Sequence, residues 1–173
     1  MKKSIIAIFA FAFIALFANT TYAQGKKDIV GTAISVADFS TLVTALKAAD
    51  LVSALQGDGP FTVFAPTNAA FSKVDPTALG NLLKPENKAA LSKVLTYHVV
   101  SGKLEAADVV KALKKGNGKV DLTTLSGDKL KVVSKDGGIF LMDEQGNYSK
   151  ITSTDVMTTN GVIHIIDTVV MPD

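Results

Sequence analysis

The spacing of apolar residues changes along the chain, and this change limits the folds that the sequence can adopt. In the first half, apolar residues such as Phe39, Leu42 and Leu46 repeat at the spacing of one helix face. In the second half, Lys129–Val133 alternates with the period of a strand, and short strands follow one another. Helices followed by hairpins predict an α+β domain with an antiparallel sheet.

Prolines, glycines and β-branched residues mark the expected boundaries of further elements. Three more helices are expected, two of which begin with proline, at Pro76–Leu83, Pro85–Val94 and Glu105–Leu113. Runs rich in β-branched and aromatic residues favour strands, at Phe61–Ala65, Leu95–Val100, Lys129–Val133 and Val162–Val169. The segments KDGG and DEQGN predict hairpin turns between the later strands.

Residues 1–23 are expected to be a cleaved export signal. Lys2 and Lys3 precede the apolar run Ile5–Ala18, and small residues lead up to a cleavage site after Ala23. The run is shorter than the roughly 20 residues that a membrane span needs, although an uncleaved anchor is the alternative. Cleavage predicts one secreted domain, Gln24–Asp173, in the periplasm or outside a bacterial cell, with no membrane insertion.

The charge of the expected mature chain argues against a nucleic-acid partner. All 18 basic residues are lysines, and 16 of them remain without Lys2 and Lys3, equal to the 16 acidic residues. Arginine is the residue that grips phosphate and guanine edges with paired hydrogen bonds. A neutral chain without arginine therefore predicts a partner other than nucleic acid.

The sequence offers no recognisable catalytic or metal-binding set. There is no cysteine, and the two histidines, His98 and His164, are far apart in the sequence, unlike the ligands of a zinc site. Asp167 follows His164 by three residues, so in a strand their side chains point to opposite faces. Both histidines are interpreted as structural. We expect no enzyme, metal or cofactor, and a hydrolase that uses a histidine or a carboxylate pair is an alternative.

Three stretches resemble the signature boxes of the fasciclin-like domain family. They are GPFTVFAPTNAAF (Gly59–Phe71), VLTYHVVSGKL (Val94–Leu104) and NGVIHIIDTVVMP (Asn160–Pro172). Their order and spacing fit that family, and the resemblance covers roughly Asp28–Asp173. It implies a fasciclin-like fold, with an antiparallel β wedge or sandwich and several helices packed on one side. It also implies an extracellular adhesion or interaction module that is generally not an enzyme.

Within these boxes, the resemblance points to positions with a structural role. They are Phe64, Pro66, Thr67, Phe71, Asn160, Gly161 and His164. We expect Pro66 to end a strand and Thr67 to cap the helix that buries Phe71. We expect Asn160 and Gly161 to supply the positive φ angles of a tight turn.

The resemblance also suggests contact residues. In adhesive animal members, an Asp-Ile pair before the last box and the Tyr-His box are associated with integrin binding. The matching residues here are Asp155-Val156 and Tyr97-His98. The alternative is that Tyr97 and Val156 belong to the core. The expected partner is a cell-surface or matrix protein or a polysaccharide, and the alternative function is a carrier of an apolar small molecule such as a carotenoid or lipid.

Overall fold

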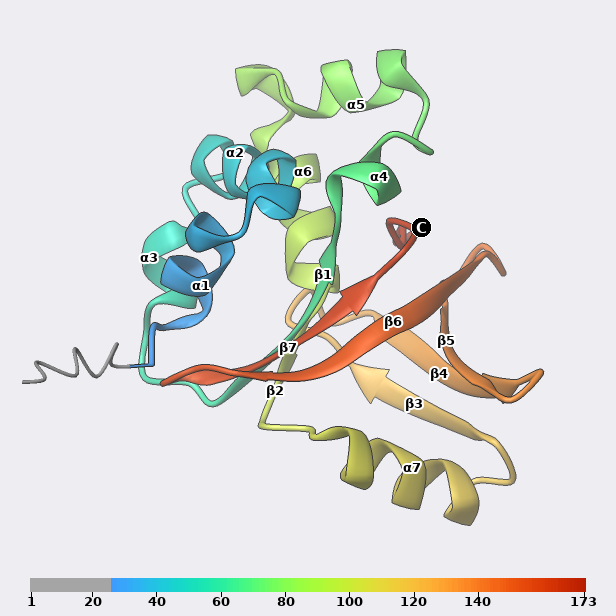
Figure 1. Cartoon of the computed structure of the whole chain (residues 1–173). Helices are drawn as coiled ribbons and strands as arrows, with labels where there is room; N and C mark the ends of the chain where they lie inside the picture. The colour runs from blue at the N-terminus through green and yellow to red at the C-terminus, as the bar shows by residue number, and fades with distance from the viewer. Residues whose placement is uncertain (1–25) are drawn as a thin grey trace, which may run out of the picture.

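The computed structural model describes residues 26–173 (Figure 1). The export signal expected at residues 1–23 lies outside the described residues. The helices are α1 (Ile29–Ser35), η1 (Ala37–Phe39), α2 (Ser40–Ala48), α3 (Val52–Leu55), α4 (Asn68–Phe71), α5 (Pro76–Leu82), η2 (Pro85–Asn87), α6 (Lys88–Tyr97) and α7 (Ala106–Lys115). The strands are β1 (Phe61–Pro66), β2 (Val99–Ser101), β3 (Lys119–Thr123), β4 (Lys129–Lys135), β5 (Gly138–Met142), β6 (Tyr148–Met157) and β7 (Gly161–Ile166).

The strands form one sheet in the order β2-β1-β7-β6-β5-β4-β3. Neighbouring strands run antiparallel except for β1 and β7, which are parallel and pair from Phe61 opposite Gly161 to Pro66 opposite Ile166. The expectation of a wholly antiparallel sheet was therefore wrong at its centre. Parallel strands need a long connection, and here most of the domain lies between the two strands.

The helices begin where short polar side chains can cap them. The Asp28 carboxylate accepts a hydrogen bond from the Gly31 N–H at 2.6 Å at the start of α1. As expected, Thr67 caps α4, with 3.3 Å between its hydroxyl oxygen and the Ala70 nitrogen. A capping box opens α7. Such caps satisfy amide groups that the first helical turn leaves unpaired.

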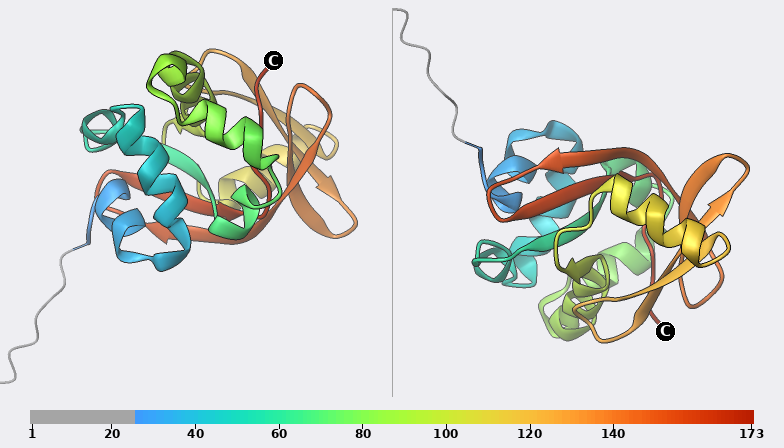
Figure 2. Two further views of the ribbon diagram at one scale, coloured as in Figure 1. Left: turned by 90° about the horizontal axis from the view of Figure 1, so that it is seen from above. Right: turned by 90° about the horizontal axis from the view of Figure 1, so that it is seen from below.

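Two hydrophobic clusters lie on opposite faces of the central strands. The first is formed with α1–α6 and includes Phe39, Leu95 and Ile163. The second includes Phe64 and Ile166 and extends over the inner face of the later strands. Figure 2 shows α7 apart from the other helices. It packs against β3 and β4. Several helices thus cover one side of the central strands, as expected, and α7 lies apart from them.

The Tyr-His box is helical rather than extended. A strand was expected over Leu95–Val100, but α6 continues to Tyr97 and β2 covers only Val99–Ser101. The box thus turns from helix to strand at His98, so His98 does not lie on a strand as expected. The helical end places the Tyr97 ring in the second cluster, where it is fully buried. Tertiary packing has overridden the local strand preference here.

The helices of residues 26–173 are short. None of them alone is long and apolar enough to cross a membrane. Together, α1 and the segment Ala37–Ala48 pass on length and composition, but they are bent by 111°.

Candidate functional site

His164 lies at the centre of the sheet and is held on both ring nitrogens. Its Nε2 lies 2.7 Å from the Leu104 carbonyl oxygen, and its Nδ1 accepts the Asp155 N–H at 3.4 Å. These partners correspond to a neutral ring with its hydrogen on Nε2. The ring stacks on Phe64, with 5.6 Å between centroids. His164 therefore connects the core of the sheet to two segments nearer the surface.

Asp155 occupies an irregular part of β6. The pairing of β6 with β7 shifts register between Ile151 and Ser153 and again between Ser153 and Val156. Asp155 has a φ of 59°, a left-handed conformation that aspartate tolerates better than most residues. Its Oδ1 accepts the Ala106 N–H at 2.8 Å, at the first residue of α7. The bulge thus aims the carboxylate at the helix start.

The segment before α7, which we call the α7 loop (Gly102–Glu105), is held by hydrogen bonds to Thr62 in β1. The Thr62 hydroxyl donates to the Gly102 carbonyl at 2.7 Å and accepts the Leu104 N–H at 2.9 Å. At the surface, Lys103 and Glu105 form a half-exposed ion pair at 2.7 Å. The loop and Asp155 together present charged groups on a rigid support.

We call this surface the Asp155 surface: Lys103, Leu104, Glu105, Asp155 and Val156. Val156 is half-buried and packs against the first hydrophobic cluster, while Asp155 is partly exposed. The arrangement can bind a partner through charge and shape. Of the four expected contact residues, Asp155 is thus partly exposed beside the start of α7, and Val156 is half-buried against the first cluster.

Tyr97 and His98 lie elsewhere, inside the domain. Tyr97 is 0% and His98 is 3% exposed. The Tyr97 hydroxyl donates to the Lys129 carbonyl at 2.9 Å. Burial, together with the carboxylates of Glu144 and Asp143, raises the pKa of Tyr97 above its ordinary value. A partner cannot touch either side chain in this conformation.

His98 fastens the C-terminal segment to α6. Its Nδ1 lies 2.8 Å from the Val94 carbonyl oxygen, and its Nε2 accepts the Val170 N–H at 3.3 Å. Burial lowers the pKa of His98 to about 4, although the hydrogen bond to Val94 opposes the change. The ring is therefore neutral at physiological pH, and its neutral form is what the two bonds need.

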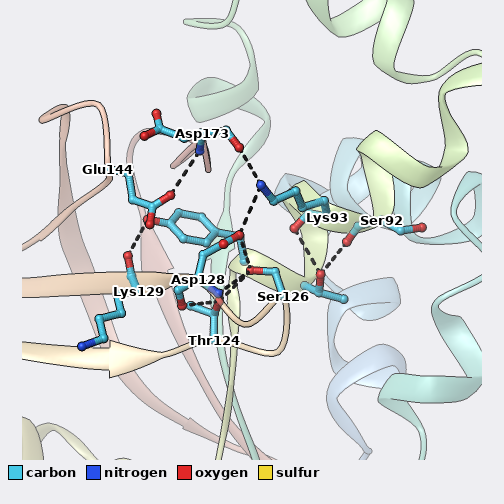
Figure 3. A network of polar contacts seen from close by, with 10 residues as sticks. Ser92, Lys93, Thr124, Ser126, Asp128, Lys129, Glu144 and Asp173 are labelled. Carbon is cyan, nitrogen blue, oxygen red and sulfur yellow. Dashed lines mark hydrogen bonds and ion pairs between the residues drawn. The ribbon is translucent and has the colours of Figure 1, made fainter.

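A polar network near Lys129 also holds the C-terminal segment (Figure 3). Lys93 donates to the Asp173 carbonyl at 2.5 Å and lies 3.5 Å from the Asp128 carboxylate. The Asp173 N–H donates to Glu144 at 3.2 Å. Figure 3 shows the ammonium end of Lys129 pointing away from this network. Local sequence patterns do not predict this network, because its members come from separate elements.

Asn160 and Gly161 lie at the turn between β6 and β7, which the Thr158 N–H closes by donating to the Gly161 carbonyl at 3.0 Å. Neither has a positive φ angle, so the expectation of such angles was wrong. The Asn160 side chain instead accepts the Ile29 N–H at 3.0 Å and donates to the Leu55 and Gly57 carbonyls at 2.8 and 3.0 Å. It joins three segments that are remote in the sequence.

Gly161 is required by a close approach of two strands. A Cβ atom at this position would lie 2.1 Å from the Phe61 carbonyl oxygen in β1. No side chain fits at that distance, and backbone atoms of a central strand cannot move away cheaply.

The first box occupies the positions that were expected of it. Phe64 is fully buried in β1, and Pro66 is the last residue of that strand. Phe71 is buried at the end of α4, just after the cap at Thr67. These residues form a continuous strand-to-helix connection next to β7.

Asp167, the carboxylate considered for hydrolysis, is engaged away from His164. It accepts hydrogen bonds from the Lys150 N–H at 2.9 Å and the Thr168 hydroxyl at 3.0 Å. Lys73 lies 3.4 Å from its carboxylate. Burial alone would raise the pKa of Asp167, but these bonds and the Lys73 ammonium hold it below its ordinary value. The side chains of Asp167 and His164 share no hydrogen bond, since each bonds to other groups.

The described residues have neither a cluster of metal ligands nor a large enclosed apolar cavity. Among residues 26–173, no three histidine, cysteine, aspartate or glutamate side chains gather to hold a metal ion. Two enclosed apolar hollows in the helical half have volumes of about 10 and 20 Å³. Their size is that of one water molecule or less. Both hollows are too small for a lipid or carotenoid, and a wider hollow of about 520 Å³ beside α4 and α5 is an open surface depression.

A family model for the fasciclin domain matches residues 37–172. The chain belongs to the fasciclin domain family. Protein sll1483 of Synechocystis sp. is 45% identical to it over 158 residues, which cover 89% of this chain and 81% of that protein. Immunogenic protein MPB70 of Mycobacterium bovis is 34% identical over 145 residues, covering 78% of this chain and 64% of that protein.

Animal proteins contain similar segments. Transforming growth factor-beta-induced protein ig-h3 of Sus scrofa is 37% identical over 139 residues, covering 78% of this chain but 18% of that protein. The solved FAS1 domain pair of the insect cell adhesion molecule fasciclin I matches with a TM-score of 0.72 at 22% identity. It covers 83% of this chain and 50% of that chain. The family resemblance and the α+β fold are confirmed.

Proposed function

We propose that this protein is a secreted, non-catalytic attachment module that binds a cell-surface or matrix partner. Its membership of the fasciclin domain family carries the proposal. The similarity to a fold found in an insect cell adhesion molecule supports it. Secretion follows from the sequence of residues 1–23, and N-terminal sequencing of the protein from the culture medium should begin at Gln24.

We place one partner contact at the Asp155 surface rather than at Tyr97 and His98, because those two side chains are buried. Asp155 has two roles that an experiment must separate. Its Oδ1 anchors the start of α7, and its negative charge is available to a cationic group of a partner. An alanine substitution would remove both roles, whereas Asp155→Asn keeps a side-chain acceptor and removes only the charge.

The experiment measures binding of the purified protein to intact host cells and to surface polymers extracted from them. The matched control is Asp50→Asn, because Asp50 also has a left-handed φ, of 55°, and is exposed in a different turn. We expect saturable binding by the wild type and by Asp50→Asn. Asp155→Asn should bind roughly tenfold more weakly, as expected when one charge-assisted contact is lost.

Two results would contradict the proposal. Absence of saturable binding to both cells and polymers would overturn the attachment function. Equal binding by the two aspartate variants would overturn the assignment of the contact to Asp155. Thermal melting of all three proteins is the control that tests whether each remains folded.

A further inference from the structure

The outer face of β3–β6 gathers lysines, although residues 26–173 as a whole hold equal numbers of lysines and acidic residues. Strand pairing aligns two rows across four strands, Lys119–Val133–Phe140–Lys150 and Asp121–Lys131–Met142–Tyr148. Lys129 and Lys135 extend the face along β4. We call these ten residues the basic sheet face. From strand spacing and rise it measures about 14 by 20 Å between the outermost Cα atoms.

The lysines of this face are not paired with carboxylates. The four ion pairs within residues 26–173 use Lys73, Lys88, Lys93 and Lys103, and none of these belongs to the face. Asp121 is the one carboxylate in the two rows. The face therefore carries five positive charges against one negative charge.

Carboxylates beside the face are mostly engaged by other groups. Asp128 pairs with Lys93, and buried Asp143 accepts the Asn147 N–H at 2.8 Å. Glu144 accepts the Asp173 N–H. Asp167 accepts the Lys150 N–H and lies beside Lys73, and Asp136 is exposed in the turn that follows β4. At one end of the face, Asp121, Asp143 and Glu144 line a hollow together with Lys129 and Lys131.

Aromatic rings stiffen the centre of the face. Phe140 and Tyr148 meet edge to face, with centroids 6.4 Å apart. The Lys135 ammonium lies over the Tyr148 ring, 4.7 Å from its centroid, in a cation–π contact. Val133 is 6% exposed although it points outward, so neighbouring side chains cover the apolar strip. The result is an ordered surface with ammonium groups outermost.

We propose that the basic sheet face binds a linear acidic polysaccharide whose carboxylate or sulfate groups lie across the strands. Lysine ammonium groups are hydrated point charges on flexible stems, and they suit anionic groups spaced along a flexible chain. The inference rests on the proposed attachment function, and it adds the chemical class of a partner at a face separate from the Asp155 surface.

Two other polyanions fit this face less well. Nucleic-acid binders stack bases on aromatic rings and use arginine forks, whereas this chain has no arginine and the exposed Tyr148 ring already has the Lys135 ammonium over it. A lipid surface is bound by several large apolar side chains that enter it. On this face, Tyr148 is 45% exposed, but Val133 is buried and Phe140 and Met142 are half-buried. An acidic polysaccharide requires neither feature.

The test measures binding of the purified protein to polygalacturonate, with dextran as a neutral polymer. The face variant carries Lys119→Gln, Lys131→Gln and Lys150→Gln. The matched control carries Lys47→Gln, Lys84→Gln and Lys111→Gln, which remove the same charge from exposed helical and loop positions. We expect the face variant to bind polygalacturonate roughly tenfold more weakly, the order expected when three solvated ion pairs are lost. The control should bind like the wild type, added salt should weaken binding, and dextran should not bind.

Several outcomes would overturn the inference. Equal losses in the two triple variants would show attraction to net charge rather than to this face. Absence of binding to both polygalacturonate and sulfated heparin would exclude the polymer class. Tighter binding to a thymidine oligonucleotide, or to vesicles of phosphatidylglycerol and phosphatidylcholine, would identify a different partner.

The polymer assay also separates this inference from the attachment proposal. Asp155→Asn should bind polygalacturonate like the wild type, and its loss of polymer binding would contradict the separation of the two faces. Face-dependent polymer binding without attachment to host cells would support the inference and overturn the attachment proposal.

Discussion

The central strands and the outer strands of the sheet bury their residues in different ways. In β1 and β7 nearly every residue is buried, because a hydrophobic cluster covers each face. In β3 exposed and half-buried residues alternate, and the first residues of β4 alternate between buried and less buried positions, because the outer face meets solvent. The difference shows why the packed centre leaves few side chains free for a partner, and why both surfaces that we propose as contacts lie outside β1 and β7.

The two regions also use polar groups differently. At the centre, Asn160, His98 and His164 bond to backbone atoms of remote segments and act as connectors. On the outer strands, Lys119 and Lys150 extend into solvent. Substitutions at the centre should therefore lower stability, and substitutions on the outer strands should change binding.

The largest expected effect compares Gly161 with Gly138. In Gly161→Ala, the new Cβ would meet the Phe61 carbonyl oxygen of a central strand. In Gly138→Ala, it would lie 3.0 Å from the Phe140 side chain, which can move. We expect Gly161→Ala to lower the free energy of unfolding by about 4 kcal/mol or more, and Gly138→Ala by about 1 kcal/mol or less. Urea denaturation measures both, and similar losses would contradict the contrast between rigid centre and adaptable periphery.

Asn160 should have the next largest effect. Asn160→Ala removes three hydrogen bonds and leaves the Ile29 N–H and the Leu55 and Gly57 carbonyls without this partner. We expect a loss of about 2–4 kcal/mol in the free energy of unfolding. The control is Asn147→Ala in an exposed turn between outer strands, which should cost about 1 kcal/mol or less. An equal effect of the two substitutions would mean that the hydrogen bonds of Asn160 add little to the free energy of unfolding.

His98 makes the stability of the centre depend on pH. The pKa of its folded state, about 4, lies below the ordinary value of 6.5, so only the unfolded state gains a proton between these values. The stability that His98 contributes is present above pH 6.5 and falls as pH decreases towards 4, by on the order of 3 kcal/mol. Denaturation as a function of pH should show this decrease in the wild type and a shallower one in His98→Gln. Parallel pH profiles for the two proteins would show that His98 is not the titrating group.

The smallest effect on stability is expected at Asp155, between the two regions. Asp155→Ala removes the acceptor for the Ala106 N–H and should cost about 1 kcal/mol, like the loss of a helix cap. Asp155→Asn keeps an acceptor and a residue suited to the left-handed conformation, so its stability should be nearly unchanged. Thermal denaturation compares them. A large loss in the asparagine variant would show that the charge itself stabilises the loop, and it would weaken the use of that variant as a binding test.

Much of the secondary structure could be predicted from local patterns. Caps and prolines act within one or two turns of a helix, so Thr67, Pro76 and the start of α7 could be recognised from the sequence. The alternation in β4 likewise predicted a strand with one solvent face. In contrast, Leu95–Tyr97 was assigned to a strand, because its strand preference does not reveal the packing that extends α6.

The sequence boxes determined the family and the α+β class, because they combine helix caps, a buried strand and a last strand in a specific order. Only the tertiary structure decided the parallel pairing of β1 with β7, the close approach at Gly161 and the burial of Tyr97 and His98. It also decided that lysines from three strands share one face. Each of these features depends on which remote segments become neighbours, and the local spacing of residues does not predict those contacts.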